Sequence, residues 1–560
     1  MNAGFSHNGK TLLSGVDPAG KADKIAGAVS PAGRTLYLCP SPLFGYGLEC
    51  LLNRIASASN AALLCIEADP ALYALSRENF PASLLGNSRL RLTNICDAAL
   101  LCSFIKREWG SRFFRRVEIV RLSGGWQLFP ALYETLAESI RREIALDWGN
   151  AMTLTKLGRL YIRNALRNLP LIPRCSSPEA LFFGSVPVLV LGAGPSLDKA
   201  LDSLAARFGR AVQTPENRPF KLICVDTCLS ALHERGITPD LAVILESQHW
   251  NLADFTGLCG QKIPVAMDLS ALPRSGNILD AGVSLFFTPW TRLAIFDRLD
   301  AAGLLPLQFP PLGSVGLSAV SMARRLTAGT VIVCGMDFSF SLDSYHARST
   351  PGHQKKLRSS SRFTSLLNAA SAFGGSVFPV APETGRCFFS TPALRQYRDL
   401  FEREFAGEDA PAVFAIEGGG FPLGVKTISM EETFSILSGA KGVSCNAIGG
   451  AANAAVSKPD LAARLRNFIC GEIDRLTRMK DMLTGSAPMD HAALAVLVDE
   501  CDYLWAHFPD YAASDRRPGK AELEDGSDSA ISFLKRLRVE IDPFLKILRL
   551  TAGDALACSR

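Results

Sequence analysis

Residues 188–198 constrain the fold more than any other stretch of this chain. An apolar run typical of a buried strand breaks there into Gly192, Gly194 and Pro195, and Ser196 is placed to start a helix. Glycines let a backbone come close to a ligand, and a serine with the free N–H groups of a helix start can bind phosphate or another anion. The stretch predicts the first strand, loop and helix of a nucleotide-handling α/β domain. A Gly-x-Gly pair alone is weak evidence, because any tight strand-to-helix turn favours glycine.

Composition sets the class of protein. A chain of 560 residues should form about three domains of ~100–200 residues each. Apolar residues make up 48% and the net charge is only +5, which predicts several packed cores and no nucleic-acid binding. The 15 cysteines include no C-x-x-C pair, as in proteins of a reducing compartment. With no signal-like start and no apolar stretch of membrane length, we expect a cytoplasmic protein without a membrane span.

The first 165 residues predict a Rossmann-like accessory domain. Residues 1–30 lack periodicity and are expected to form a loose lead-in, followed by the α/β domain over 31–165. The loop 40–47 is glycine-rich, and Glu67 ends the next expected strand, an order that resembles class I methyltransferases and lets the acid take a ribose hydroxyl. Because prolines interrupt the loop, a ligand site and a non-catalytic scaffold both stay open.

Residues 166–424 predict a second α/β domain. Its strands read as continuous apolar runs, which is typical of a parallel sheet that is covered on both faces. Ligands of such sheets collect at the carboxyl ends of the strands. The sequence therefore predicts one crevice that brings together Gly192 to Ser196, Asp226 with Thr227, Glu246 to Gln248, and Asp337.

Beyond residue 424 the pattern changes to helical spacing with almost no strand signal, so 425–560 is expected to be a helical domain. The predicted fold class is α/β, with two Rossmann-like parallel-sheet domains followed by a C-terminal helical domain.

Several motifs recur in an order that resembles the motility accessory factor family. They are Gly-Ala-Gly-Pro-Ser-Leu at 192–197, the strand that ends at Asp226, Gly-Ile-Thr-Pro-Asp at 236–240, Gly-Ser-Val-Gly at 313–316, Gly-Met-Asp-Phe at 335–338 with Tyr345-His346, and Gly-Gly-Gly at 418–420. That family consists of flagellin glycosyltransferases whose central domain resembles bacterial sialyltransferases and 6-hydroxymethylpterin diphosphokinase. The resemblance covers most of residues 35–430.

The resemblance implies a set of residues around the cytidine monophosphate (CMP) part of an activated nonulosonic acid. The implied donor-binding residues are Gly192, Gly194, Pro195, Ser196, Thr227, Glu246, Gly313, Ser314 and Gly316. Asp226 and Glu246 stand where sialyltransferases tend to have asparagine. Two carboxylates beside a phosphate either repel it or hold a divalent metal such as Mg²⁺. No tightly bound cofactor is expected.

Three residues are candidates for the chemistry. His346 can serve as the general base for an acceptor hydroxyl or as the acid for the leaving phosphate, since a histidine pKa lies near neutrality, or it is a solvent-exposed loop histidine. Asp337 orients substrate or caps the following turn, and Asp226 ends a strand at the edge where ligands bind.

Three functions remain open from the sequence. The first is transfer of a nonulosonic acid of the pseudaminic, legionaminic or sialic type to serine or threonine of flagellin, as motility requires. The second is an ATP- and Mg²⁺-dependent diphosphokinase acting on a pterin-like alcohol, although a Walker motif is lacking. The third is a non-catalytic assembly factor that binds flagellin.

Overall fold

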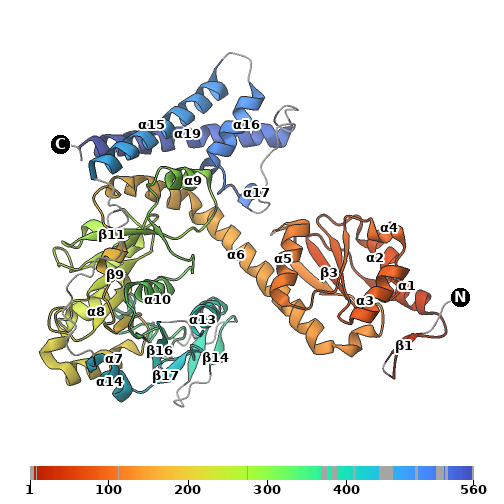
Figure 1. Cartoon of the computed structure of the whole chain (residues 1–560), viewed down its shortest axis with the longest axis horizontal. Coiled ribbons are helices and arrows are strands. Elements are labelled where there is room, and N and C mark those ends of the chain that lie inside the picture. Colours follow the sequence, from red (N-terminus) through yellow and green to blue (C-terminus); the bar gives the residue numbers. More distant parts are fainter. Residues whose placement is uncertain are drawn as a thin grey trace. The chain divides into compact units, whose positions relative to one another are not determined.

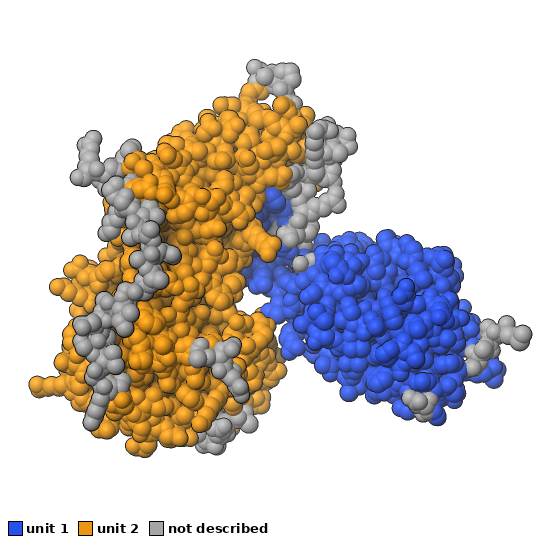
Figure 2. Space-filling model, viewed as in Figure 1, with its two compact units in different colours: residues 1–159, 505–519 blue, residues 160–504, 520–560 orange. Residues whose placement is uncertain are grey.

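The chain divides into two compact units, shown in different colours in Figure 2. Unit 1 comprises residues 1–159 and 505–519, and unit 2 comprises residues 160–504 and 520–560. The computed structural model describes residues 5–7, 9–110, 112–273, 275–366, 375–380, 387–407, 411–439, 458–485, 490–512, 523 and 527–557.

Unit 1 is built on a four-stranded parallel sheet in the order β5-β4-β3-β6 (Figure 1). Along β3, Tyr37 and Cys39 pack into one core while Leu36 and Leu38 pack into the other. Both faces are covered, which explains why this strand is apolar at successive positions. The elements are β3 (Thr35–Pro40), α2 (Leu48–Ile55), β4 (Ala62–Ile66), α3 (Pro70–Asn79), α4 (Ala82–Leu85), β5 (Leu90–Thr93), α5 (Ala98–Trp109), β6 (Arg116–Ile119), α6 (Pro130–Asn168), which continues into unit 2, and α17 (Pro509–Ala512).

The N-terminal segment is ordered where the sequence predicts a loose lead-in. It forms the hairpin β1 (Phe5–His7) and β2 (Lys10–Leu13), followed by α1 (Pro18–Ala28). Leu12 and Leu13 are buried against Leu43 and Leu72, and the small residues of α1 pack into the core with α2. Short strands and a helix that is buried through alanines give almost no periodic signal, so the expectation was wrong here.

Unit 2 contains a nine-stranded sheet in which all neighbouring strands are parallel. Its order is β12-β11-β10-β9-β8-β7-β13-β16-β17, so the direction of chain progress reverses between β7 and β13. The strands are β7 (Val188–Leu191), β8 (Lys221–Val225), β9 (Leu241–Ile244), β10 (Val265–Asp268), β11 (Val283–Phe287), β12 (Leu307–Gln308), β13 (Val331–Cys334), β16 (Val413–Ile416) and β17 (Lys426–Ile428), and a separate antiparallel pair is β14 (Phe378–Val380) with β15 (Phe388–Ser390).

The reversal places the helices on two opposite faces, because parallel crossovers are right-handed. Helix α10 packs on β7, β8, β9 and β13, and α7 packs beside α14 (Figure 1). Connections that lead from one strand to the next in the direction of β12 therefore cover the same face of the sheet as α7. Connections that lead in the direction of β17 cover the same face as α10. The helices are α7 (Leu197–Phe208), α8 (Leu229–Glu234), α9 (Ala294–Ala301), α10 (Val315–Leu326), α11 (Pro351–Ser359), α13 (Pro392–Phe405) and α14 (Met430–Ser438).

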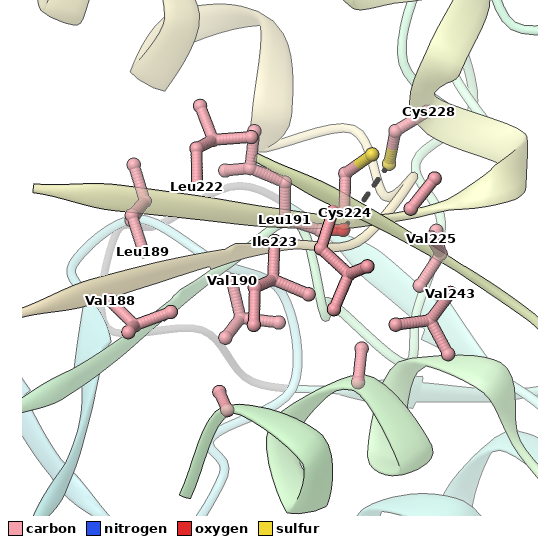
Figure 3. Close-up of a cluster of buried hydrophobic side chains, with 14 of the residues drawn as sticks. Val188, Leu189, Val190, Leu191, Leu222, Ile223, Cys224, Val225, Cys228 and Val243 are labelled. Atoms are coloured by element: carbon pink, nitrogen blue, oxygen red, sulfur yellow. Dashed lines mark hydrogen bonds between the residues drawn. The ribbon is translucent and has the colours of Figure 1, made fainter. Parts of the chain in front are cut away.

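The core of unit 2 is centred on β7 and β8, which are continuous apolar runs in the sequence. Val188 to Leu191 are fully buried beside the apolar residues of β8 (Figure 3). The Cys228 thiol donates to the carbonyl oxygen of Leu191 at 3.4 Å, where β7 ends. Every cysteine in the described ranges is unpaired, and the core uses this residue as a small apolar side chain.

The C-terminal helices of unit 2 are joined to the α/β part by a buried ion pair. The Arg298 guanidinium on α9 donates to both carboxylate oxygens of Glu472 at 2.7 and 2.9 Å, and Glu472 is fully buried. Tyr503 and Arg475 donate to the same carboxylate. The helices are α15 (Lys458–Thr484), α16 (His491–Glu500) and α19 (Asp528–Ala557), and α15 packs on the other two.

Replacing Glu472 by Gln should lower the free energy of unfolding of unit 2 by about 3 kcal/mol, because it leaves the Arg298 cation without its counter-charge. Asp474→Asn is a matched control, since it breaks an exposed pair with Arg478 on the same helix and should change stability by at most ~0.5 kcal/mol. Urea unfolding of both variants checks this expectation, and equal effects would contradict the importance of the buried pair.

Candidate functional site

The loops after β7 and β13 are in direct backbone contact. The Gly192 N–H donates to the Cys334 carbonyl at 2.8 Å, and the Gly194 N–H donates to the Gly335 carbonyl at 2.7 Å. A Cβ atom on Gly335 would lie 2.2 Å from the Gly192 oxygen, and one on Gly192 would lie 2.4 Å from the Gly335 oxygen. The glycines are therefore required for the approach of one loop to the other, whereas the sequence suggested an approach to a ligand.

Asp337 stabilises this contact between the loops after β7 and β13, which is called the junction below. Its buried carboxylate accepts hydrogen bonds from the Ser196 N–H at 2.7 Å, from the Ser196 hydroxyl at 2.5 Å, and from the backbone N–H of Gly420. Burial raises the Asp337 pKa, and these hydrogen bonds oppose that rise. The expected anion site at the start of α7 is thus taken up by a carboxylate of the chain itself, because Ser196 neither caps the helix with its side chain nor keeps a free N–H.

Asp226, at the end of β8, is also buried and hydrogen-bonded. The Asn251 amide donates to its Oδ2 at 2.7 Å and the Thr227 N–H donates to its Oδ1 at 2.9 Å. Asn251 also donates to Asp254 at 3.1 Å. Burial raises the pKa of Asp226 to about 6 and that of Asp254 to about 7, so Asn251 joins two carboxyl groups that are difficult to ionise.

The expected metal pair does not have the character of a metal site. Glu246 is exposed and accepts from the Gln248 N–H at 2.8 Å, while the oxygens of Asp226 face Asn251 and Thr227. Within the described ranges, no group of three or more His, Cys, Asp or Glu side chains is arranged to hold a metal ion. A divalent ion does not fit these residues as they stand, because Asp226 has its oxygens already occupied.

The start of α10 is a helix N-terminus that lacks a side-chain cap. Gly313 has a left-handed φ of +66°, and Ser314 is the N-cap residue without a side-chain capping bond. A Cβ atom on Gly313 would lie 3.5 Å from Tyr397 on α13, whose pKa burial raises. Gly316 lies within the first turn of the helix. Unpaired N–H groups in the first turn favour a bound anion.

Tyr161 on α6 belongs to the same region and was not predicted. Burial, together with the nearby Glu246 and Tyr397, raises its pKa to about 12. The side-chain amides of Asn164 and Asn168, on the following turns, anchor α6 to the ends of β9 and β10. Their four acceptors are the backbone carbonyls of Ser247, Ser270, Leu269 and Ala271, at 2.9 to 3.2 Å.

His346 lies against the Gly-Ala-Gly loop. The segment after β13 returns over this loop, where the Ala347 N–H donates to the Ala193 carbonyl at 2.9 Å. His346 is half-buried and forms a hydrogen bond with the Ala193 backbone. Burial lowers its pKa and this hydrogen bond opposes the change, so the neutral imidazole is favoured at neutral pH. Phe338 and Ser349, which bracket the segment, have left-handed φ values of +42° and +70°, a strain that often accompanies functional sites.

A cavity of about 160 Å³ lies elsewhere, between α7 and residues 417–423. Ser196, Gly335 and Asp337 line it, whereas Asp226, Glu246 and Ser314 do not. The residues that the sequence assigns to one crevice therefore do not all line one cavity.

Glu67 of unit 1 is committed to its own loop. The Ser41 hydroxyl donates to its carboxylate at 2.9 Å, and Ser41 and Leu43 both have left-handed φ values, of +49° and +51°. Burial raises the Glu67 pKa to about 7. The carboxyl group thus stabilises a strained loop that the β1–β2 hairpin covers through Leu12 and Leu13, and this arrangement favours the scaffold interpretation.

Comparison with known proteins supports the resemblance seen in the motifs. Residues 163–343 match the family described as 6-hydroxymethylpterin diphosphokinase MptE-like. An uncharacterized protein of Treponema pallidum (strain Nichols) is 30% identical over 544 residues, covering 93% of this chain and 88% of the relative. A second protein of that organism is 26% identical over 144 residues, 23% of this chain and 61% of its own length.

The MAf glycosyltransferase of Magnetospirillum magneticum AMB-1 has the same fold. The match covers 99% of this chain and 90% of that one, with a TM-score of 0.50 and 13% identity. The predicted resemblance and the α/β fold class with C-terminal helices are confirmed. Among the helices described, none is both long and apolar enough to cross a membrane.

We expect Gly335→Ala to destabilise unit 2 by about 2 kcal/mol or more, because the added Cβ meets the Gly192 carbonyl and the residue keeps a φ of +71°. Gly257→Ala is the matched control, since Gly257 has a φ of +81° but no atom within 4 Å of the added Cβ. Calorimetric melting of the two variants measures the difference. Equal losses would mean that backbone strain, and not the contact between the loops, explains the glycine.

Proposed function

The chain belongs to one family with its Treponema pallidum relative, and on this premise we propose that it is a glycosyltransferase that uses a CMP-activated nonulosonic acid. The observation that carries the proposal is the fold shared with the MAf glycosyltransferase over nearly the whole chain. The acceptors we propose are serine and threonine hydroxyls of flagellin.

In the proposed reaction, the bond between the anomeric carbon and the phosphate oxygen breaks, and CMP leaves with the electron pair. The sugar passes through an oxocarbenium-like state, and the acceptor hydroxyl oxygen forms the new bond to the anomeric carbon. His346 takes the acceptor proton, since its neutral imidazole is held by the Ala193 backbone. The first turn of α10, at Ser314, stabilises the charge that develops on the phosphate.

Asp226 and Asp337 act as positioning residues in this proposal. Asp337 holds Ser196 and the Gly-Ala-Gly loop, and Asp226 holds Asn251 and Thr227. Their buried carboxylates already accept hydrogen bonds within the chain. In this proposal Thr227 and Glu246, at the ends of β8 and β9, contact the nucleotide.

A second candidate function has a specific basis in the match of residues 163–343 to the MptE-like family. A diphosphokinase would bind ATP with Mg²⁺ and a pterin-like alcohol. Thermal-shift measurements with CMP, with ATP plus Mg²⁺, and with a pterin alcohol separate the two candidates. Mass spectrometry of flagellin from cells with and without this protein then tests transfer, and stabilisation by CMP without any change in flagellin would point to a binding factor.

The phosphate position is tested by Ser314→Asp. Aspartate is a good N-cap residue, so α10 should remain intact, but its charge repels a phosphate at the helix start. We expect CMP affinity to fall about tenfold or more in calorimetric titration, the equivalent of about 1.4 kcal/mol. Ser429→Asp, at the N-cap of α14, is the control and should bind CMP like the parent. Unchanged CMP affinity in Ser314→Asp would place the phosphate elsewhere.

His346→Ala should leave donor affinity unchanged and reduce transfer by about 10²–10⁴-fold, the usual contribution of a general base. Since the base must be unprotonated, kcat/KM of the parent should fall as the pH drops through the lowered pKa of His346. This acid limb should be absent in the variant. A variant that transfers at the parental rate, or keeps the limb, would remove His346 from the mechanism.

A further inference from the structure

The cavity between α7 and residues 417–423 lies apart from the crevice proposed for the donor. It opens at the carboxyl ends of β13 and β16, and its outer walls come from α7, β17 and α14. The start of α10, where the donor phosphate is proposed to bind, lies on the opposite face of the sheet from α7, because the two helices belong to crossovers that run in opposite directions along the sheet. Between the two regions, the contact of Gly192 with Gly335 leaves no space even for a Cβ atom.

The walls of this cavity carry opposite charges and hydroxyl groups. Lys199 and Ser203 lie one turn apart on the same face of α7, and Glu417 and Thr427 face them from the β16–β17 side. In the part of the chain that the structure describes, Lys199 has no ion-pair partner. A side chain at Gly418 would meet no atom within 4 Å, so this end of the loop faces open space.

The remaining lining is apolar and adaptable. Met336 and Met430 contribute thioether side chains, which adjust readily to the shape of a ligand. A cavity of about 160 Å³ is smaller than the ~300–1,000 Å³ that hold drug-sized ligands, so it suits a molecule of monosaccharide size.

We propose that this cavity binds a small hydroxylated acid, a molecule of monosaccharide size that carries one carboxylate or phosphate group. Its anionic group pairs with the Lys199 ammonium, and its hydroxyl groups bond with Ser203, Thr427 and Glu417. The carbon skeleton lies against the two methionines. The site does not depend on the proposed transfer reaction. It shares Ser196, Gly335 and Asp337 with the contact between the loops after β7 and β13.

Calorimetric titration of the full chain tests the site with four probes: glucose 6-phosphate, glucuronate, glucose and inorganic phosphate. We expect saturable binding of at least one of the two sugar acids, with glucose and phosphate binding far more weakly. Lys199→Ala should weaken that binding about 10- to 100-fold, as expected for loss of a hydrogen bond to a charged group. Thr427→Val should weaken it by a smaller factor. Lys262→Ala, an exposed lysine outside the cavity, is the control and should bind like the parent.

CMP binding, measured on the same samples, separates this proposal from the proposed function. Lys199→Ala should bind CMP like the parent, whether or not transfer to flagellin is ever observed. The proposal is overturned if neither sugar acid binds, if Lys199→Ala binds them like the parent, or if phosphate alone binds as tightly. It is also overturned if CMP displaces the sugar acid, because the cavity would then belong to the donor crevice.

Discussion

The carboxylate of Asp337 connects three loops on which the architecture of unit 2 depends. It accepts hydrogen bonds from Ser196 after β7 and from Gly420 after β16, while its own backbone follows β13. Burying a charge is costly unless hydrogen bonds compensate for it, so the three loops are held in one arrangement or the carboxylate is left unsatisfied. The glycine contact between the loops and the placement of His346 over Ala193 both rely on this arrangement.

One consequence concerns the point where the strand order reverses, between β7 and β13. Parallel α/β sheets usually bind a ligand in the crevice at such a point. Here the two loops that would border the crevice contact each other directly, and the cavity lies beside them, against α7. Tyr161, Tyr397 and the start of α10 lie near one another. The segment after His346 bonds to Asp198 on α7, the helix that also carries Lys199. Because the two loops are already in contact, they need no reorganisation when a ligand binds beside them.

Sequence reasoning found the strands and their end loops because continuous apolar runs and glycine turns leave strong local signals. It expected His346 to be a general base or an exposed loop residue, whereas the structure holds this side chain against Ala193 of the Gly-Ala-Gly loop. It did not foresee that Ser196 bonds to Asp337, 141 residues away. Nor did it find Asn251, Asp254, Tyr161 or Tyr397, whose importance arises only when separate elements pack together. The hairpin over residues 5–13 escaped for a different reason, because strands of three and four residues are too short to show a period.

The anchoring of α6 bears on how such a protein can change over evolutionary time. Asn164 and Asn168 recognise main-chain carbonyls, and a carbonyl is present whatever side chain occupies the position. The loops that follow β9 and β10 can therefore accumulate substitutions while α6 stays anchored and Tyr161 stays in position. Selection is thus free to reshape these loops while leaving the inherited framework undisturbed.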